Sequence, residues 1–348
     1  MCIYTLFSQS VISFFNSCKQ MEEEEEKHEQ GEREIYESLV LTYKEVSQNL
    51  QTLESFGSNI AYRRLNVSDK NLTDVRVIPH FQNLLYVNVS GNRLTSEAFR
   101  VLETMPYLRE LLADRNLLTS AELKPMRCLQ ILTLNQNKLT YAGTSVIPHV
   151  SLEYLELKNN LISTIVFEDN PDNEILRNLK ILELRGNALT TTAGKTGIRC
   201  SNLRQLFLAQ NQIEQIESLG YLPNLTTLHL RSNRLANLDG FSAKCHNLSY
   251  INLRDNNIPN ISELAKLSCL PNLKKLIILE NPFLQKIRET EETKYIHIVL
   301  MMLPELDKID KIFVEDPERE QAKILHKNIK ARGYDFTVFD LEGFVLKD

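Results

Sequence analysis

Spaced leucines recur along most of this chain at an interval of just over twenty residues. From Leu203 the sequence is LRQLFLAQNQI, and eleven residues later it is LTTLHLRSNRL, which ends at Leu235. Both segments fit the pattern leucine-x-x-leucine-x-leucine-x-x-asparagine-x-apolar, and Asn211 and Asn233 lie 22 residues apart. A match at every patterned position in two successive segments predicts a structural repeat.

The same frame extends in both directions along the chain. It places asparagines 21 to 27 residues apart at Asn92, Asn116, Asn137, Asn160, Asn187, Asn211, Asn233, Asn256 and Asn281. One earlier unit keeps the apolar frame with Leu65, Val67 and Leu72, but Lys70 takes the asparagine place. The sequence therefore predicts about ten leucine-rich repeats.

This pattern predicts an α/β solenoid, a leucine-rich repeat horseshoe with a concave parallel sheet. In each unit the spaced leucines point inward around one short strand, and no single unit can bury them without its neighbours. The asparagine stands where the chain leaves the strand, so its amide can bond backbone groups that the turn would bury. Irregular return segments, including the longer fifth unit, are expected on the convex side.

The segments before the repeats predict a disordered acidic N-terminus at 1–34 and a capping helix at 35–57. The run from Met21 to Glu34 is too acidic to bury a core. Residues 1–20 are apolar but lack a basic start and a cleavage site, so a signal peptide and a membrane span are disfavoured, and translation from Met21 is an alternative. The helix is expected to cover the open edge of the first strand; its signals are a capping box at Thr42 and Glu45, helical spacing of Val46, Leu50, Leu53 and Phe56, and Gly57 at its end.

The repeat array is predicted over 58–283 and a C-terminal cap over 284–314. In the cap, apolar residues at helical spacing precede Pro304, and Leu306 and Ile309 can return to the sheet. Residues 315–348 are predicted to form a helix from Asp316 to about Arg332 and a tail. The helix has a narrow apolar stripe, so it projects or docks weakly, and the apolar tail folds back or binds a partner.

Composition and motifs exclude several classes of function. A net charge of -5 and a pI near 5.9 argue against nucleic acid as the main partner. Six cysteines without a Cys-x-x-Cys pair predict a reduced, cytoplasmic protein. The loop Ala193–Gly197 lacks the glycine that a phosphate-binding loop needs four residues earlier, where Leu189 stands. We find no catalytic or metal-ligating arrangement, so the sequence predicts no enzyme, no cofactor and no metal site.

The outward residues of the strands form the candidate binding surface. Alternation along each strand places Tyr154, Phe207, His229 and Tyr250 on the concave face. The column just after the strand holds cations in neighbouring units at Lys158, Arg185, Arg231 and Arg254, with Ala209 as the exception. Glu156 and Glu183 are expected to pair with the first two of these cations.

Arg231 and Arg254 have no carboxylate in the strand positions of their own units, although Asp255 is adjacent. Clusters of arginine and aromatic residues are typical of interface anchors. The hypothesis is that an acidic or helical partner segment docks here, and the alternative is a solvated face. The predicted protein-binding residues are Tyr154, Arg185, Phe207, His229, Arg231, Tyr250 and Arg254.

The run from Phe207 to Asn256, the segment ELAKLSCLPNLKKLIILENP and the cap sequence LPELDKID together resemble the leucine-rich repeat-containing protein 23 family. The resemblance covers about residues 40–330 and is strongest from Asn178 to Asp310. It implies a non-enzymatic subunit of the axonemal radial spoke in cilia and flagella, monomeric within a larger complex and attached to spoke proteins through its C-terminal region. Lys70, the apolar tail and the first twenty residues depart from the family pattern.

Two other classes remain as alternatives. A cytosolic regulator that binds a phosphatase through its concave face shares short intracellular repeats and a similar cap, but its repeats are more uniform in length. An RNA-splicing adaptor would have fewer repeats and a more basic surface.

Overall fold

The computed structural model describes residues 39–56, 59–168, 176–192, 198–217, 219–288 and 295–331. The predictions for the N-terminus at 1–34, for residues 169–175 of the fifth unit, for the loop at 193–197 and for the tail beyond 331 lie outside these residues. Within the described part, none of the helices has the length and apolar character needed to cross a membrane.

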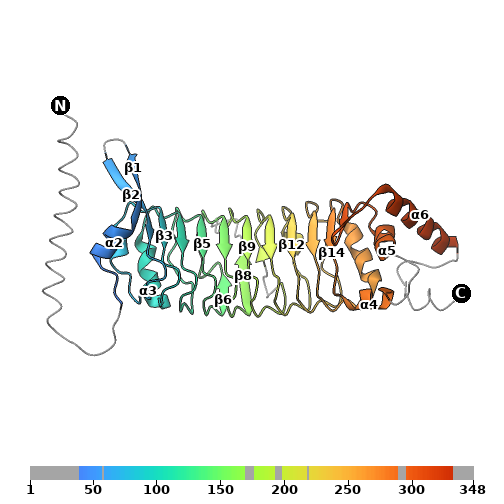
Figure 1. Ribbon diagram of the computed structural model, residues 1–348, viewed down its shortest axis with the longest axis horizontal. Coiled ribbons are helices and arrows are strands. Elements are labelled where there is room, and N and C mark those ends of the chain that lie inside the picture. The colour runs from blue at the N-terminus through green and yellow to red at the C-terminus, as the bar shows by residue number, and fades with distance from the viewer. Residues whose placement is uncertain are drawn as a thin grey trace.

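One sheet of 13 strands runs along the long axis of the molecule (Figure 1). Neighbouring strands from β2 to β15 are parallel, whereas the outer pairs β1–β2 and β15–β16 are antiparallel. In spatial order the strands are β1 (Leu50–Phe56), β2 (Asn59–Asn66), β3 (Tyr86–Asn88), β4 (Glu110–Leu112), β5 (Ile131–Thr133), β7 (Tyr154–Glu156), β9 (Ile181–Glu183), β11 (Gln205–Phe207), β12 (Thr227–His229), β13 (Tyr250–Asn252), β14 (Lys275–Ile277), β15 (Lys308–Ile309) and β16 (Ile312–Phe313).

The strands follow the sequence frame, which confirms the predicted leucine-rich repeat solenoid. Strand β2 precedes Lys70, and each strand from β3 to β14 in this sheet precedes one of the nine asparagines. The middle residue of each short parallel strand from β3 to β14, such as Leu182, Leu206 or Leu228, is fully buried. The leucines of successive units form one continuous core along the solenoid.

The return segments are more regular than expected. Three of them pair as a second, parallel sheet in the order β10-β8-β6, built from β6 (Tyr141–Gly143), β8 (Thr164–Glu168) and β10 (Ile198–Arg199). Others hold short helices: η1 (Ile78–His80), α3 (Ser96–Arg100), η2 (Val101–Thr104), η3 (Leu219–Tyr221) and η4 (Ile261–Cys269).

The stacking of the units depends on bonds made by each buried asparagine. The amide nitrogen of Asn233 donates to the carbonyl of Leu208 in the preceding unit at 2.9 Å and to that of Leu230 in its own unit at 3.0 Å. Its amide oxygen accepts the N–H of Ile213 at 3.0 Å. The other asparagines of the column make the same kind of bonds. Each asparagine therefore joins two units while it satisfies their buried backbone groups.

Lys70 departs from this column because the first unit has no preceding repeat to bond. Its own backbone N–H donates to the side-chain oxygen of Asn92 at 3.1 Å, and the N–H of Leu72 donates to the same oxygen at 3.0 Å. Asn92 of the second unit thus bonds the backbone of the first unit. Lys70 can therefore replace an asparagine without interrupting the bonds between these units.

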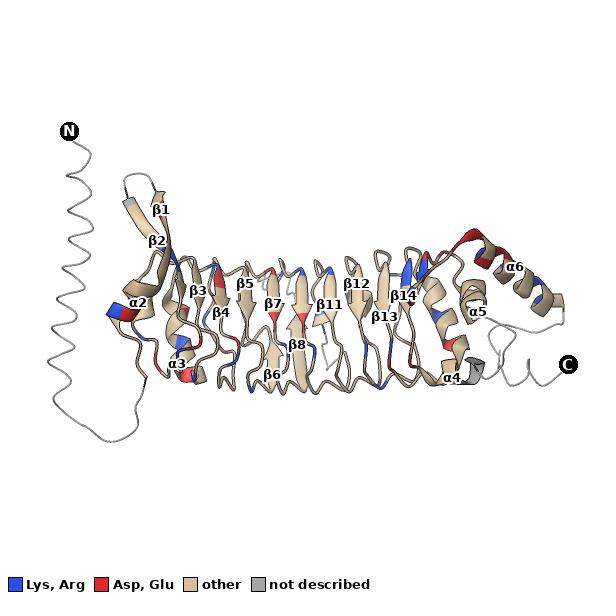
Figure 2. Cartoon of the chain, viewed as in Figure 1, with Lys and Arg blue, Asp and Glu red and all other residues tan. Residues whose placement is uncertain are grey.

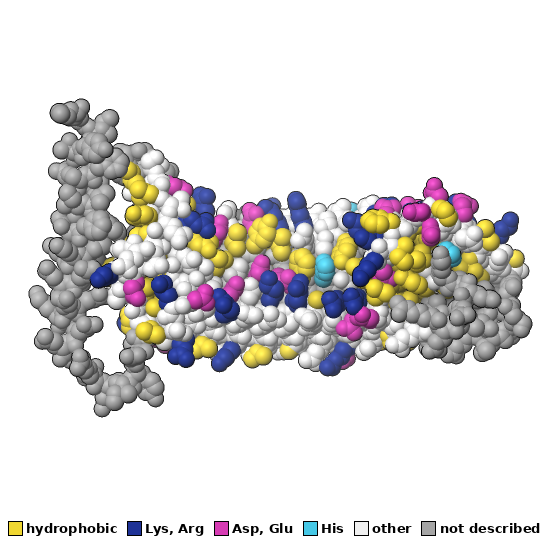
Figure 3. Space-filling view, viewed as in Figure 1, with side chains coloured by type: hydrophobic (Ala, Val, Ile, Leu, Met, Phe, Trp, Pro, Cys, Tyr) yellow, Lys and Arg dark blue, Asp and Glu magenta, His cyan; other side chains and the backbone are white. Residues whose placement is uncertain are grey.

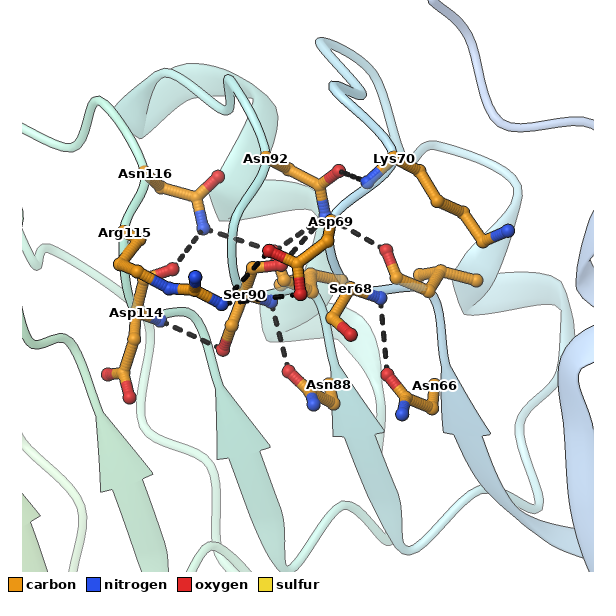
Figure 4. Close-up of polar contacts among 12 residues, drawn as sticks. Asn66, Ser68, Asp69, Lys70, Asn88, Ser90, Asn92, Asp114, Arg115 and Asn116 are labelled. Atoms are coloured by element: carbon orange, nitrogen blue, oxygen red, sulfur yellow. Dashed lines mark hydrogen bonds and ion pairs between the residues drawn. The ribbon is translucent and has the colours of Figure 1, made fainter.

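A left-handed residue precedes each position of the asparagine column. Their φ angles lie between 53° and 69°, at Asp69, Gly91, Arg115, Gln136, Asn159, Gly186, Gln210, Ser232, Asp255 and Glu280. In Figure 4 the Asp69 side chain meets the Arg115 guanidinium, with 3.0 Å between Oδ1 and Nη2. A Cβ on Gly91 would approach Asp69 Oδ1 to 2.0 Å, so glycine leaves room for this bridge between the first and third units.

The N-terminal cap differs from the prediction of one long helix over 35–57. Helix α2 (Tyr43–Asn49) begins with the predicted capping box, since Thr42 and Glu45 bond each other's backbone N–H groups. It ends at Asn49, and the next seven residues form β1. The apolar stripe failed as a helix signal because Leu53 faces solvent and is 55% exposed. Backbone pairing with β2 stabilises the extended conformation of residues 50–56. A strand rather than a helix therefore covers the edge of the first repeat.

The C-terminal cap follows the predicted return to the sheet. After α4 (Pro282–Arg288), helix α5 (Tyr295–Met302) precedes Pro304, and β15 then pairs with β14. Asp310 fixes this turn because its carboxylate accepts the N–H of Ile278 and the hydroxyl of Tyr295, each at 2.8 Å.

Helix α6 (Asp316–Ala331) packs beside α5 rather than projecting freely (Figure 1). Ala322 and Ile329 are buried, and Arg319 donates to the carbonyls of Pro304 and Leu306. Ile324, on the outer side of the helix, remains 51% exposed. The narrow apolar stripe is thus enough to dock α6 on the cap.

The asparagine ladder yields a stability prediction. Asn233→Ala removes the partners of three buried backbone groups, and each such loss costs about 1 to 3 kcal/mol. We expect the free energy of unfolding to fall by about 3 kcal/mol or more, measured by urea unfolding followed by circular dichroism. The control is Asn224→Ala, because Asn224 is exposed and its side chain makes one bond, to the carbonyl of Ser201. Equal midpoints for the two variants would contradict the prediction.

Buried His149 yields a prediction of pH dependence. Its Nδ1 accepts the N–H of Met126 at 3.2 Å, and burial lowers the pKa of His149 from 6.5 to about 4. The unfolded chain therefore binds one more proton between these values, so the stabilisation is complete above pH 6.5 and is lost as the pH falls towards 4. We expect a loss of about 3 kcal/mol over this window, and a smaller loss for His149→Gln. Urea midpoints of both proteins at pH 7.5 and 4.5 test this, and parallel losses would contradict it.

Candidate functional site

The outer face of the 13-stranded sheet is the candidate site, and here it is called the sheet face. Side chains alternate along each strand, so the middle residue enters the core and the first and third residues point outward. On β7, Leu155 is fully buried, whereas Tyr154 is 39% exposed and Glu156 is partly exposed. Figure 3 shows a band of hydrophobic side chains on this face between two rows of lysine and arginine.

Three of the predicted residues form one row of neighbouring rings. Phe207 on β11 and His229 on β12 occupy paired positions, with ring centroids 4.8 Å apart and an interplanar angle of 25°. His229 also meets Tyr250 on β13, with centroids 4.9 Å apart. Neighbouring strands place the rings side by side, so this aromatic row joins three successive units.

The aromatic row is partly shielded from water, and this burial shifts the pKa values of His229 and Tyr250. Burial lowers the pKa of His229, and the positive charge of Arg185 lowers it further. Burial raises the pKa of Tyr250, against a hydrogen bond with Asn252 that lowers it. At neutral pH the row is therefore uncharged and presents an apolar surface.

Two of the predicted cations pair within their own units, as expected from the sequence. Lys158 Nζ lies 2.9 Å from Glu156 Oε2, and Arg185 Nη2 lies 3.4 Å from Glu183 Oε2.

The two carboxylates respond differently to these partners. Burial opposes ionisation of Glu156, but hydrogen bonds from Lys158 and Asn135 outweigh it and lower the pKa of Glu156. Burial dominates at Glu183 and raises its pKa, because its arginine partner is more distant. Glu183 is thus the less well neutralised member of the two pairs.

Arg254 has a partner that the sequence analysis missed. Its guanidinium makes two hydrogen bonds to the carboxylate of Glu280, with Nε 2.9 Å from Oε2. Glu280 lies in the turn after β14, so it belongs to the next unit and does not share a strand with Arg254. The sequence analysis considered only the carboxylates of Arg254's own unit, so it did not identify Glu280 as the partner of Arg254.

Arg231 is exposed and, among the described residues, has neither a hydrogen bond nor an ion pair from its side chain. It follows β12 by two residues, directly beyond the aromatic row. Of the four cations in this column, Arg231 is thus the one left to attract a partner.

The remaining predicted residue, Tyr154, lies on β7 and is separated from Phe207 by strand β9. Ile181 on β9 pairs with Tyr154 and is partly exposed, so it continues the apolar surface between them. At the other end, Ile277 on β14 is also partly exposed. The sequence analysis passed over both isoleucines, although the same strand alternation placed them on this face.

Acidic and basic residues are interspersed along the described part of the solenoid (Figure 2). No group of three or more histidine, cysteine, aspartate or glutamate side chains that could hold a metal ion occurs within the residues the structure describes. The chemistry that the sheet face offers is contact with another molecule through apolar and cationic side chains.

Comparisons with known proteins place this fold in a family. The family models described as "Leucine rich repeat" and "Leucine Rich repeats (2 copies)" match residues 177–235 and 223–266. Leucine-rich repeat-containing protein 23 of Homo sapiens is 38% identical over 295 residues, which cover 83% of this chain and 80% of that protein. The Mus musculus protein of the same name is 36% identical over 318 residues, covering 90% and 89% of the two chains.

A chain in the solved octameric complex of Latrophilin 3, Unc5D and FLRT2 (LRR) has the same fold. It matches with a TM-score of 0.50 and 18% identity, and the match covers 74% of this chain and 86% of that one.

The aromatic row yields a testable prediction. Phe207→Ala uncovers the imidazole of His229, and because hydration favours the charged form, we expect the pKa of His229 to rise towards 6.5. Nuclear magnetic resonance titration of the imidazole C–H signals measures this shift. Tyr86→Ala is the control, since it removes an aromatic ring from distant β3 on the same face. An unchanged pKa in Phe207→Ala would show that the stacking does not shield His229.

Proposed function

The chain belongs to the leucine-rich repeat-containing protein 23 family, and we propose that it is a non-catalytic scaffold of the axonemal radial spoke in motile cilia and flagella. There it binds other spoke subunits, as a single copy within the larger complex, and supports beating. The observation that carries this proposal is the similarity to the human and mouse relatives, which extends over most of each chain. The radial-spoke role is what the resemblance to this family implies.

The sheet face supports a role in binding proteins. It combines an uncharged row of aromatic rings with exposed cations, a composition that is typical of protein interfaces. The rings are held on a sheet whose strands are bonded to both neighbours, so little conformational entropy is lost when a partner docks. A rigid surface of this kind suits a permanent structural subunit.

The C-terminal helix supports a second attachment point. Ala322 and Ile329 hold α6 against the cap, and Ile324 is left on the side that faces away from the protein core. A docked helix with an exposed apolar residue can contact a neighbouring subunit without unfolding the cap. This agrees with the expectation that the C-terminal region joins spoke partners.

The proposal predicts retention of the chain on the axoneme. We expect the tagged full-length chain, expressed in cells with motile cilia, to remain with the axoneme after detergent extraction. Retention should fall when residues 332–348 are removed or when Ile324→Asp is introduced, because each change alters the C-terminal surface but spares the buried side of α6.

Leu161→Asp is the matched control, since Leu161 is a similarly exposed apolar residue in the middle of the array, at 58%. A chain that is released into a soluble or nuclear pool and co-purifies with a phosphatase would refute the spoke proposal and favour a phosphatase regulator.

A further inference from the structure

Six partly exposed apolar or aromatic side chains lie across six neighbouring strands of the sheet face. They form a band, here called the apolar row, that shifts between the first and third strand positions from β7 to β14: Tyr154, Ile181, Phe207, His229, Tyr250 and Ile277. At about 4.8 Å per strand, five intervals give a length of about 24 Å. The row crosses neighbouring strands, so it runs along the axis of the solenoid (Figure 1).

The strands of the sheet face from β7 to β14 have no free edge with which a partner strand could form backbone hydrogen bonds. Each strand from β7 to β14 in this sheet is hydrogen-bonded to a strand on both sides. An extended peptide laid across them would find no free strand edge, and its own N–H and C=O groups would lose water without gaining partners. A helix satisfies its backbone internally, so it can place apolar side chains on the row without this cost.

Cations without partners border the row on both sides. Arg204 precedes β11, and Lys275 is the first residue of β14, so both lie at the strand beginnings. Arg231 lies at the opposite side, beyond the end of β12. All three side chains are exposed and, within the described part of the chain, form no hydrogen bond or ion pair.

These three cations differ from the other cations beside the apolar row, which form ion pairs: Lys158, Lys180, Arg185, Arg254 and Lys274. Glu156, Glu183 and Glu280 each accept a neighbouring lysine or arginine. Asp255 is exposed and offsets part of the remaining charge. The uncompensated charge around the aromatic row is therefore positive, and it attracts an acidic partner.

We propose that the sheet face binds an acidic, amphipathic α-helix of a partner protein, lying along the solenoid axis from β7 to β14. Its apolar stripe covers the apolar row, and carboxylates on its flanks pair with Arg204, Arg231 and Lys275. A helix of about 16 residues spans the 24 Å row at 1.5 Å per residue. This inference rests on the proposed function, because it names the class of segment that the scaffold holds.

The first test selects partners by chemistry. Purified full-length chain is presented with a displayed library of peptides that tile axonemal proteins, each about 30 residues long so that it exceeds the 16-residue helix. We expect the enriched peptides to have a net negative charge and apolar residues at a spacing of three and four. Enrichment of basic or strand-patterned peptides, or of none, would overturn the proposal.

The second test measures the contribution of the face to affinity. We expect the combined variant Arg204→Glu, Arg231→Glu and Lys275→Glu to weaken binding of an enriched peptide about tenfold or more, a loss that shrinks as salt screens the charges. Phe207→Ala with Tyr250→Ala should weaken binding by a similar factor, but independently of salt. Fluorescence anisotropy with the labelled peptide measures both effects.

A matched control reverses three other exposed cations that are unpaired among the described residues and lie in return segments. These changes are Arg93→Glu, Lys138→Glu and Lys244→Glu. Equal weakening in this control would show that net charge, rather than the sheet face, governs binding. A peptide with proline at its centre should bind poorly if the bound form is a helix, and undiminished binding would refute the helix.

These outcomes are separable from those of the spoke proposal. Peptide binding is measured on the purified chain, whereas axonemal retention is measured in cells. If acidic helices bind the purified chain but the chain is not retained on the axoneme in cells, only the spoke role is refuted. A chain that is retained on the axoneme but selects no acidic helix would refute this inference alone.

Discussion

The structure depends on the need to satisfy buried backbone groups wherever the chain leaves the sheet. Each unit after the first turns at the end of a three-residue strand, and that turn is enclosed by the neighbouring units. The asparagine supplies a donor for two carbonyls and an acceptor for one N–H in that enclosed space. Because two of these three bonds reach the preceding unit, the asparagine satisfies the turn and joins the repeats at the same time.

The turn also requires the residue just before the asparagine to adopt the left-handed backbone conformation, with a positive φ. Non-glycine residues adopt this conformation at a cost of about 1 kcal/mol, so polar residues and glycines are found there and β-branched residues are not. At Gly91 the condition is stricter, since the space of a side chain is taken by the ion pair of Asp69 and Arg115. Local strain is therefore repeated in the eight units that have a non-glycine residue at this position, and the asparagine bonds offset it.

A stack of repeats has two ends and one sheet face that need not be covered by other repeats. In the described residues, other elements cover the ends but not the sheet face. At the ends, β1 and β16 run antiparallel to the array and pair with the outermost parallel strands. Helix α5 and the docked α6 add apolar cover beyond β14. The sheet face has no such cover in the described residues. Its rings and unpaired cations are held at fixed spacing by the sheet, which makes it the surface where a partner can bind without rearranging the fold.

Much of this could be predicted from the sequence because it depends on contacts within one unit. The inward leucines, the asparagine column, the capping box at Thr42 and the pairs Lys158–Glu156 and Arg185–Glu183 all follow from local spacing. The return of Ile309 to the sheet follows from the apolar pattern after Pro304.

Contacts between units were decided only by the tertiary structure. The helix signal at Leu50 and Leu53 was overridden by the edge of β2, because pairing with that edge satisfies backbone groups that a longer helix would leave open. Glu280 bonds Arg254 across a unit boundary. Asn256 and Asn281 are 25 residues apart in the sequence, so local spacing does not predict this contact. The aromatic row likewise depends on the register of adjacent strands, which sets Phe207 beside His229 and His229 diagonal to Tyr250. Local spacing determines what one unit is, whereas the stacking of units determines which side chains meet.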